Sequence, residues 1–219
     1  MPRFPRVVIP GCPHHLIQRG NRRQRVFFCD EDRAFFLTLL GREAEKRGIA
    51  IWAFCLMENH FHLVAVPTRP DSFARGLGEA QRRYTLVINT REGWKGFLFQ
   101  GRFLSYPLDE DHQYAAIRYV ERNPVRAGMV VRAEDYEWSS ARAHVRKEPH
   151  PLLTRFPFER SVKDWAHYLG QKEDPDLLEG FRGHERTGRP MGGEDFVKRL
   201  ERLSGRVLAI KPKGRPRKK

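Results

Sequence analysis

Two apolar segments that follow each other closely constrain the fold of this chain more than any other feature. Residues 49–56 form a nearly continuous apolar run, and a second run, residues 60–66, begins after a gap of only three residues. Apolar runs of this length, bounded by turns, are typical of buried strands. The sequence therefore predicts two antiparallel strands joined by a short turn, and the first of them is suited to the centre of a sheet.

The second of these strands carries two histidines, His60 and His62, on either side of Phe61. Because successive side chains of a strand point to opposite faces, the two imidazoles would share one face while Phe61 turns into the core. Two imidazoles side by side on a rigid strand can hold a divalent ion from one direction and leave the rest of its shell open. Two ordinary strand histidines would show the same pattern.

The segments around the two strands predict an α+β fold. A short strand at residues 14–19 precedes a helix that starts at Asp30 and stops at Gly48. A second helix spans about residues 72–90, and a further strand, residues 100–106, follows it. The order strand, helix, strand, strand, helix, strand is that of a ferredoxin-like split βαβ antiparallel sheet, with the histidine strand in a central position.

A helix after the sheet could add to the chemistry of the histidines. It is predicted over residues 112–122 and ends at Asn123, because the following proline disfavours the helical conformation at that residue. Tyr119 and Asn123 are four residues apart and therefore lie on one face. If the helix crosses the sheet near the histidines, it offers a phenol and an amide oxygen to the same ion. A tyrosine that only packs would have the same spacing.

The charge of the chain indicates the class of its partner. Lysine and arginine total 41 against 27 acidic residues, a formal net charge of +14. So large an excess favours an anionic partner, with nucleic acid the first expectation and an anionic membrane surface the second. No apolar stretch is long enough to span a bilayer, and the three scattered cysteines indicate neither a disulfide framework nor a zinc knuckle. We expect a cytosolic protein.

Basic residues cluster where a nucleic-acid backbone could bind. They occur at the end of the first strand and in the turn after it, on one side of the second helix, in the strand at residues 100–106 and in the C-terminal tail. Cations in such positions neutralise phosphates and supply affinity without reading the sequence. The candidates are Arg19, Arg22, Arg23, Arg25, Arg82, Arg83, Arg102, Lys213, Arg215 and Arg217. Solvated basic surfaces are the competing interpretation.

The chain divides into three expected parts. Residues 1–142 hold the sheet and the site, residues 143–210 form a basic, mostly helical extension, and residues 211–219 are a tail with six cations and no acid. The tail has too little apolar content to fold alone. Its Lys213–Arg217 segment resembles an AT-hook, whose extended arginine enters the minor groove of A·T-rich DNA.

Four blocks of residues, in this order along the chain, resemble a known family. In chain order, the first block resembles the entry strand of the single-tyrosine transposases of the HUH endonuclease superfamily. The second resembles their histidine-hydrophobe-histidine signature, and the last two resemble two further blocks of these proteins. The blocks are residues 10–21, 57–62, 100–103 and 119–128. The resemblance is strongest to the REP-associated tyrosine transposases, bacterial proteins that act on repetitive extragenic palindromes, and it covers residues 10–142. Residues 184–190 resemble the C-terminal extension of some members, and Glu58 stands where many relatives have proline.

This resemblance implies a site and a reaction. His60 and His62 would bind a divalent metal, with Mg²⁺ the first expectation and Mn²⁺ the alternative, and Asn123 would complete the site. Tyr119 would attack a phosphate of single-stranded or hairpin DNA, leaving a 5′-phosphotyrosine and a free 3′-hydroxyl that can reverse the step. The bond energy is retained, so no nucleotide cofactor is expected. The protein would act as a monomer or homodimer near the nucleoid of a bacterial cytosol.

Two other functions are compatible with the sequence. A non-catalytic protein could keep the fold and bind structured DNA or RNA, and a metal-dependent nuclease could use activated water without a covalent adduct. The presence of all four site residues argues against the first, because a site that has lost its activity has no physical need of them.

Overall fold

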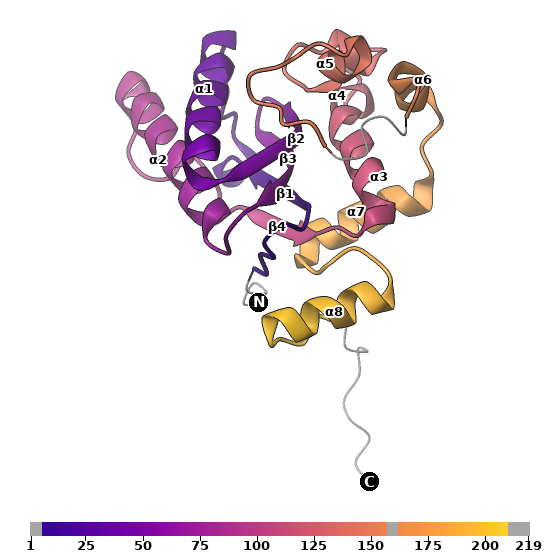
Figure 1. The fold of residues 1–219 in the computed structure, drawn as a ribbon. Coiled ribbons are helices and arrows are strands. Elements are labelled where there is room, and N and C mark those ends of the chain that lie inside the picture. The colour runs from indigo at the N-terminus through magenta and orange to yellow at the C-terminus, as the bar shows by residue number, and fades with distance from the viewer. Residues whose placement is uncertain (1–5, 157–161, 210–219) are drawn as a thin grey trace.

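A four-stranded antiparallel sheet lies at the centre of the computed structural model, which describes residues 6–156 and 162–209 (Figure 1). The strands follow the order β2-β3-β1-β4, which is the order of a ferredoxin-like split βαβ sheet. The predicted α+β class is confirmed, and the histidine strand β3 is central. The strands are β1 His14–Arg19, β2 Ile49–Leu56, β3 His60–Pro67 and β4 Leu104–Pro107.

Helices cover both faces of this sheet (Figure 1). Helices α1 and α2 pack against each other on one face, and α3 crosses β2 and β3 on the other. The helices are α1 Asp30–Arg47, α2 Ser72–Glu92, α3 Glu110–Glu121, α4 Asn123–Arg126, α5 Ala141–Arg146, α6 Trp165–Gly170, α7 Pro175–Thr187 and α8 Glu194–Ser204. In the part of the chain that the structure describes, two 3₁₀ turns, at Asn21–Arg23 and Ala133–Asp135, complete the elements.

The position predicted for β2 is wrong, because β2 forms an edge of the sheet. Its outer side is nevertheless covered, since residues 138–140 pair with it. The backbone N–H of Leu56 donates to the carbonyl of Trp138 at 2.8 Å, and that of Ser140 donates to Phe54 at 2.9 Å. Helices cover both faces of β2, and this segment covers its edge. The sequence of β2 is therefore as apolar as that of a central strand, although β2 lies at the edge of the sheet.

The last strand is shorter than expected and begins at Leu104 instead of residue 100. Gly101 adopts a left-handed conformation with φ 56°, and residues 101 and 102 form a bend before the strand. The backbone N–H of Gln100 still donates to the carbonyl of Arg19 at 2.8 Å, so the segment stays close to the end of β1. This bend brings Arg102 beside the arginine turn that follows β1.

Strand alternation separates two apolar cores. Phe61 and Leu63 point into the core between the sheet and helices α1 and α2, as predicted for Phe61. Val64 and Tyr106 point into the second core, where Ile117 of α3 packs on them. His62 and Val64 are two residues apart on β3 and point to the same face of the sheet. The histidines therefore lie on the face that is covered by α3.

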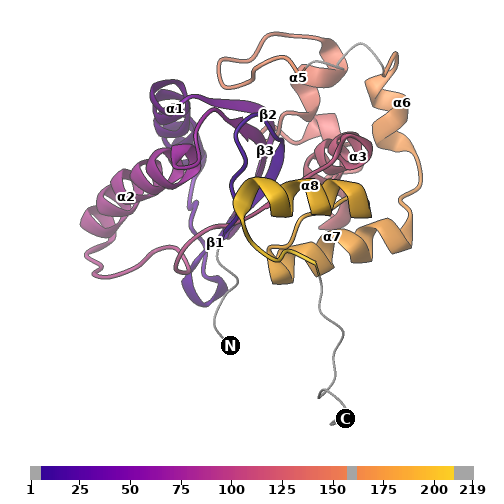
Figure 2. The same cartoon turned by 60° about the horizontal axis from the view of Figure 1, so that its bottom comes forward.

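The C-terminal segment completes this second core. Trp165 and Phe181 are buried in the same cluster as the residues of α3, and the indole N–H of Trp165 donates to the buried carboxylate of Glu121 at 2.7 Å. Helix α8 packs through Leu200 against Val7, near the N-terminal residues (Figure 2).

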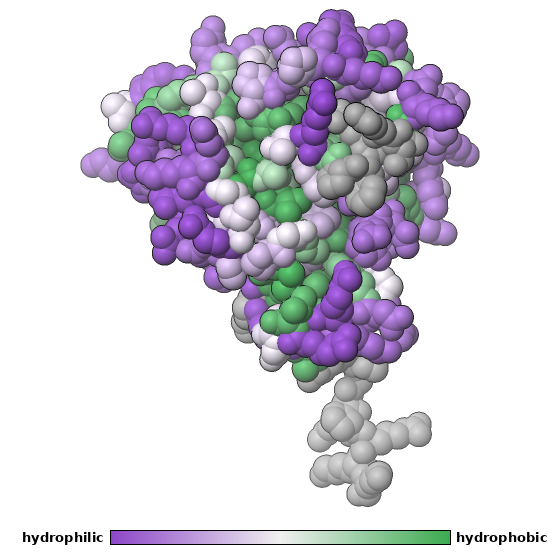
Figure 3. All heavy atoms as spheres, viewed as in Figure 1, coloured by the Kyte–Doolittle hydropathy of each residue, from purple (hydrophilic) through white to green (hydrophobic). Residues whose placement is uncertain are grey.

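Much of the outer surface of α1, α2 and α5 is hydrophilic, and apolar residues are visible between these helices (Figure 3). Within the described ranges, no helix is both long and apolar enough to cross a bilayer.

Candidate active site

Strand β3 places the two predicted histidines on one face of the sheet. The ring centroids of His60 and His62 are 5.1 Å apart, and Nδ1 of His60 lies 2.6 Å from Oδ1 of Asn59. Burial, followed by the nearby charge of Arg19, lowers the pKa of His60 to about 4, and burial holds the pKa of His62 well below its usual range. Both imidazoles are therefore neutral near pH 7, and each keeps a nitrogen lone pair that can bind a metal ion.

A third histidine, His15, lies beside His62. The antiparallel pairing of β1 with β3 sets Ile17 opposite His62, which brings His15 to the same face. Its Nε2 atom is 2.9 Å from Nδ1 of His62, and its Nδ1 atom is 2.6 Å from the hydroxyl of Tyr106. His15 is fully buried, and that burial lowers its pKa to about 3.

Helix α3 carries Tyr119 to the same place. The centroid of its ring lies 5.7 Å from that of His15 and 6.1 Å from that of His62. The guanidinium carbon of Arg126, on α4, is 4.1 Å from the centroid of the Tyr119 ring. Burial and the Glu185 carboxylate raise the pKa of Tyr119, whereas the charge of Arg126 opposes this shift.

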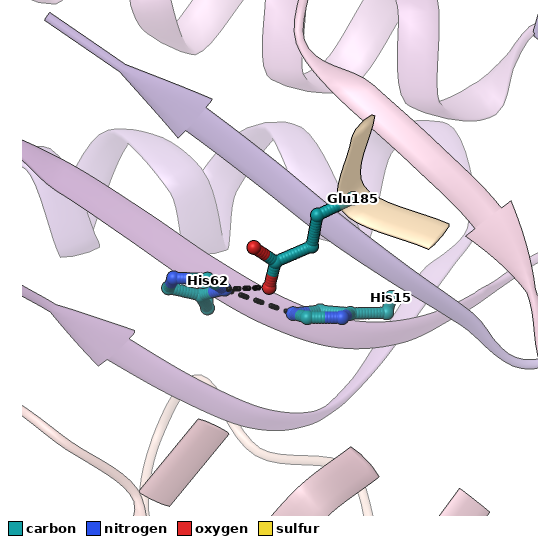
Figure 4. A group of neighbouring side chains, drawn as sticks. All are labelled: His15, His62 and Glu185. Atoms are coloured by element: carbon teal, nitrogen blue, oxygen red, sulfur yellow. Dashed lines mark hydrogen bonds and ion pairs between the residues drawn. The ribbon is translucent and has the colours of Figure 1, made fainter. Parts of the chain in front are cut away.

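Helix α7 adds a carboxylate that the sequence analysis did not assign to the site. Its Glu185 points toward His62 and His15 (Figure 4), with Oε1 4.0 Å from Nδ1 of His62. The Oε1 atom is buried and has no hydrogen-bond partner, and burial raises the pKa of this carboxyl. A buried carboxylate oxygen without a donor, next to two neutral imidazoles, is an arrangement that a cation would satisfy. These residues therefore fit a divalent metal ion.

Two of the predicted ligands, His60 and Asn123, have different surroundings. The donor atoms of His15, His62 and Glu185 are all within 4.8 Å of one another, and His60 is not one of this group. The side-chain amide of Asn123 donates to the carbonyls of Tyr119 and Val120, at 3.3 Å each, so it interacts with its own helix.

A cleft of about 770 Å³ opens beside Glu185, and six arginines line it. Arg102 reaches it from the bend before β4, and the others come from the β1 end, the turn that follows it and helix α7. Like charges gathered around one cleft favour a polyanion. The six are Arg19, Arg22, Arg23, Arg102, Arg182 and Arg186.

The other predicted basic residues have different surroundings. Arg25 pairs with Glu58 at 3.0 Å, where both side chains are about half exposed. Arg82 and Arg83 both pair with Glu79 on the outer side of α2. Lys213, Arg215 and Arg217 lie outside the described residues.

Sequence reasoning did not identify His15, Glu185 or Arg126 as parts of the site. Three signals were present in the sequence. His15 belongs to the first family-like block, Arg126 belongs to the fourth, and Glu185 lies within residues 184–190, the segment that resembles the extension of related proteins. None of these signals specifies a role, because the contacts within the site arise only when the separate elements pack together.

Comparison with solved structures finds one that shares this fold. The structure is similar to one described as the REP-associated tyrosine transposase bound to a REP hairpin, with a TM-score of 0.57, 19% identity, and coverage of 72% of this chain and 96% of that chain. A candidate transposase from Deinococcus radiodurans R1 matches with a TM-score of 0.40 and 21% identity, over 55% of this chain and 96% of that one. No curated protein matches.

The first of these similarities shows the fold, and a family model shows the family. The model of IS200-like transposases matches residues 9–123, which is more than half of the chain and includes β1, both histidines of β3 and Tyr119. This chain therefore belongs to the family of IS200-like transposases.

Proposed function

We propose that this transposase is a metal-dependent DNA strand transferase that uses Tyr119 to cleave and rejoin single-stranded or hairpin DNA. The observation that carries the proposal is the position of Tyr119, whose ring lies 6.1 Å from that of His62 although the two residues come from different elements. The protein of the similar structure was bound to a REP hairpin, which supports repetitive palindromic DNA as the substrate.

The reaction exchanges one phosphodiester bond for another. The Tyr119 oxygen attacks a DNA phosphorus, the bond to the 3′-oxygen breaks, and the departing 3′-oxygen takes up a proton. The 5′-phosphate stays on Tyr119, and attack by a 3′-hydroxyl on this bond reverses the step. A divalent ion held by His60 and His62, with Asn123 as a further oxygen ligand, would draw charge from the phosphate when bound.

The residues of the chain prepare this step in two ways. A phenol of normal pKa, about 10, is mostly protonated at pH 7. The positive charge of Arg126, 4.1 Å from the Tyr119 ring, favours the phenolate and offsets part of the cost of burial. The arginines of the cleft hold neighbouring phosphates of the DNA, so that one phosphate lies next to the tyrosine.

The test is a denaturing gel with hairpin oligonucleotides labelled at the 3′ end, incubated with Mg²⁺ or Mn²⁺. A label that stays with the protein shows the 5′-phosphotyrosine linkage. Tyr119→Phe should abolish this band, because it removes only the hydroxyl. Tyr114→Phe is the matched control, since Tyr114 lies on the same helix but contacts the ring of Phe156.

The same gel distinguishes the two alternatives. Free cut ends without a protein-linked band would identify a nuclease that uses water. Shifted but intact DNA in a native gel, with no product under denaturing conditions, would identify a binding protein. A protein-linked band that persists in Tyr119→Phe and disappears in Tyr114→Phe would move the nucleophile to Tyr114.

A further inference from the structure

Three donor atoms from three separate elements converge at one place (Figure 4). The ring of Tyr119 lies nearby, 5.7 Å from that of His15 and 6.1 Å from that of His62. His15 comes from β1, His62 from β3 and Glu185 from α7. Two of these residues are neither in the histidine-hydrophobe-histidine motif nor on the tyrosine helix. Glu185 lies beyond residues 9–123, the segment that the family model matches.

Two of the three separations between these atoms match those in the coordination shell of one ion, and the third is within 4.8 Å. In an octahedral shell with ligands at about 2.1 Å, neighbouring ligand atoms are about 3 Å apart and opposite ones about 4 Å apart. Nε2 of His15 is 2.9 Å from Nδ1 of His62, the separation of neighbouring ligands. Oε1 of Glu185 is 4.0 Å from the same Nδ1 atom, the separation of opposite ligands.

Nε2 of His15 and Nδ1 of His62 are hydrogen-bonded to each other at 2.9 Å, and a bound ion would replace this bond. If Nδ1–H of His15 donates to the hydroxyl of Tyr106, at 2.6 Å, then Nε2 of His15 carries a lone pair that points toward His62. Such an outer partner fixes the tautomer and orientation of metal-binding histidines. Oε1 of Glu185 has no hydrogen-bond partner although it is buried, so a cation would supply the interaction that it lacks.

We propose that His15, His62 and Glu185 form a divalent-metal site, in which helix α7 supplies the anionic ligand. The inference deepens and rests on the proposed function, because an ion at this site lies beside the nucleophile Tyr119. His62 is common to this set and to the set of the proposed function, in which His60 and Asn123 are the other ligands, so the test below decides which residues share the ion with His62. The C-terminal segment then becomes part of the catalytic unit, since without it the site has two neutral nitrogens and no negative charge.

The test measures Mn²⁺ binding to the full-length, EDTA-treated protein without DNA, by calorimetry and by the EPR signal of free Mn²⁺. Mn²⁺ is the probe because it accepts both oxygen and nitrogen ligands. Glu185→Gln keeps the shape of the side chain and removes its charge, so we expect Mn²⁺ affinity to fall by at least about tenfold. Glu179→Gln is the matched control, because Glu179 lies on the same helix, pairs with Arg186 and faces solvent. It should bind Mn²⁺ like the wild type.

His15→Gln should also lower Mn²⁺ affinity by at least about tenfold. Because His15 is fully buried, this variant could fail to fold, and the isosteric Glu185→Gln variant then decides the question. The thermal midpoint in EDTA is measured for each variant. If the metal-free midpoint of Glu185→Gln equals that of the wild type while its Mn²⁺ affinity falls, the loss comes from a ligand and not from the fold.

Two results would overturn the inference. One is unchanged Mn²⁺ affinity in Glu185→Gln. The other is a loss of Mn²⁺ binding in His60→Ala and Asn123→Ala while His15→Gln and Glu185→Gln bind normally. In either case, a protein–DNA band from the wild type would leave the proposed function intact. The absence of that band together with normal metal binding would contradict the proposed function and leave the metal site standing.

Discussion

The ring of Phe181 stacks on the ring of Tyr119, with centroids 4.5 Å apart and planes inclined by 21°. Phe181 belongs to α7 and is completely buried, and only 7% of the surface of Tyr119 is exposed. A helix outside the family-matched segment therefore holds the ring of the proposed nucleophile. The position of the Tyr119 ring therefore depends on the packing of α7 against α3.

We predict that Phe181→Ala lowers the free energy of unfolding by about 3 to 5 kcal/mol, the usual cost of removing a buried phenyl ring. Phe181→Leu should cost much less, because it keeps most of the apolar volume. Urea unfolding followed by circular dichroism measures both. Equal unfolding midpoints for the wild type and Phe181→Ala would show that α7 does not pack on Tyr119 in solution.

The two histidines of β3 should be needed for cleavage and not for DNA binding. His60→Ala and His62→Ala should each abolish cleavage of a hairpin oligonucleotide, while affinity in a native gel stays close to that of the wild type. Asn123→Ala should be milder, because water can replace one neutral oxygen ligand. Cleavage at the wild-type rate in either histidine variant, still sensitive to EDTA, would exclude that residue as a ligand.

The arginine cleft should account for part of the salt dependence of DNA binding. Removing one phosphate contact reduces the slope of log K against log salt by about 0.7 for a single strand or about 0.9 for a duplex. Arg102 lines the cleft, so Arg102→Ala should flatten the slope by about this amount. Arg42→Ala, an exposed change on α1, should leave it unaltered. Equal slopes in all three proteins would place the DNA elsewhere.

The basic tail, residues 211–219, lies outside the described residues and carries six cations. If about half of them contact phosphates, its deletion should flatten the same salt slope by about 2 to 3 units. Affinity should fall at low salt and change little at high salt, and cleavage at saturating DNA should be almost normal. A truncated protein that binds DNA well but does not cut it would show that the tail reaches the site.

Acid should destabilise the protein below about pH 6.5, through its buried histidines. Nδ1 of His14 lies 2.8 Å from the carbonyl oxygen of Cys12, and the N–H of Ile9 donates to its Nε2 atom. Burial lowers the pKa of His14 to about 4. Below pH 6.5 the unfolded chain therefore binds more protons than the folded one, and stability is lost as the pH falls toward 4.

The size of this effect can be measured at one residue. His14 alone contributes at most about 1.4 kcal/mol per pH unit within this window. Urea unfolding at pH 7.5, 6 and 5 gives the slope for the wild type, and His14→Gln should give a smaller one. A free energy of unfolding that does not change between pH 7.5 and 5 would mean that these histidines are not buried in the neutral form.

Local periodicity was enough to determine a large part of this protein. A period of two along β3 places His60 and His62 on one face and Phe61 on the other, and a period near 3.6 places Tyr119 and Asn123 on one face of the helix predicted after the sheet. The order of the elements gave the ferredoxin-like sheet. These features depend on neighbours a few residues apart in the chain.

Only the tertiary structure decided which elements meet. The apolar run of β2 indicates only that both faces of this strand are buried. A central strand shows this pattern, and so does an edge strand that is covered by residues 138–140. In the same way, no spacing in the sequence connects Glu185 with His62, because their contact depends on how α7 docks on the sheet. Side-chain parity is a property of one element, whereas a site built from β1, β3, α3 and α7 is a property of their packing.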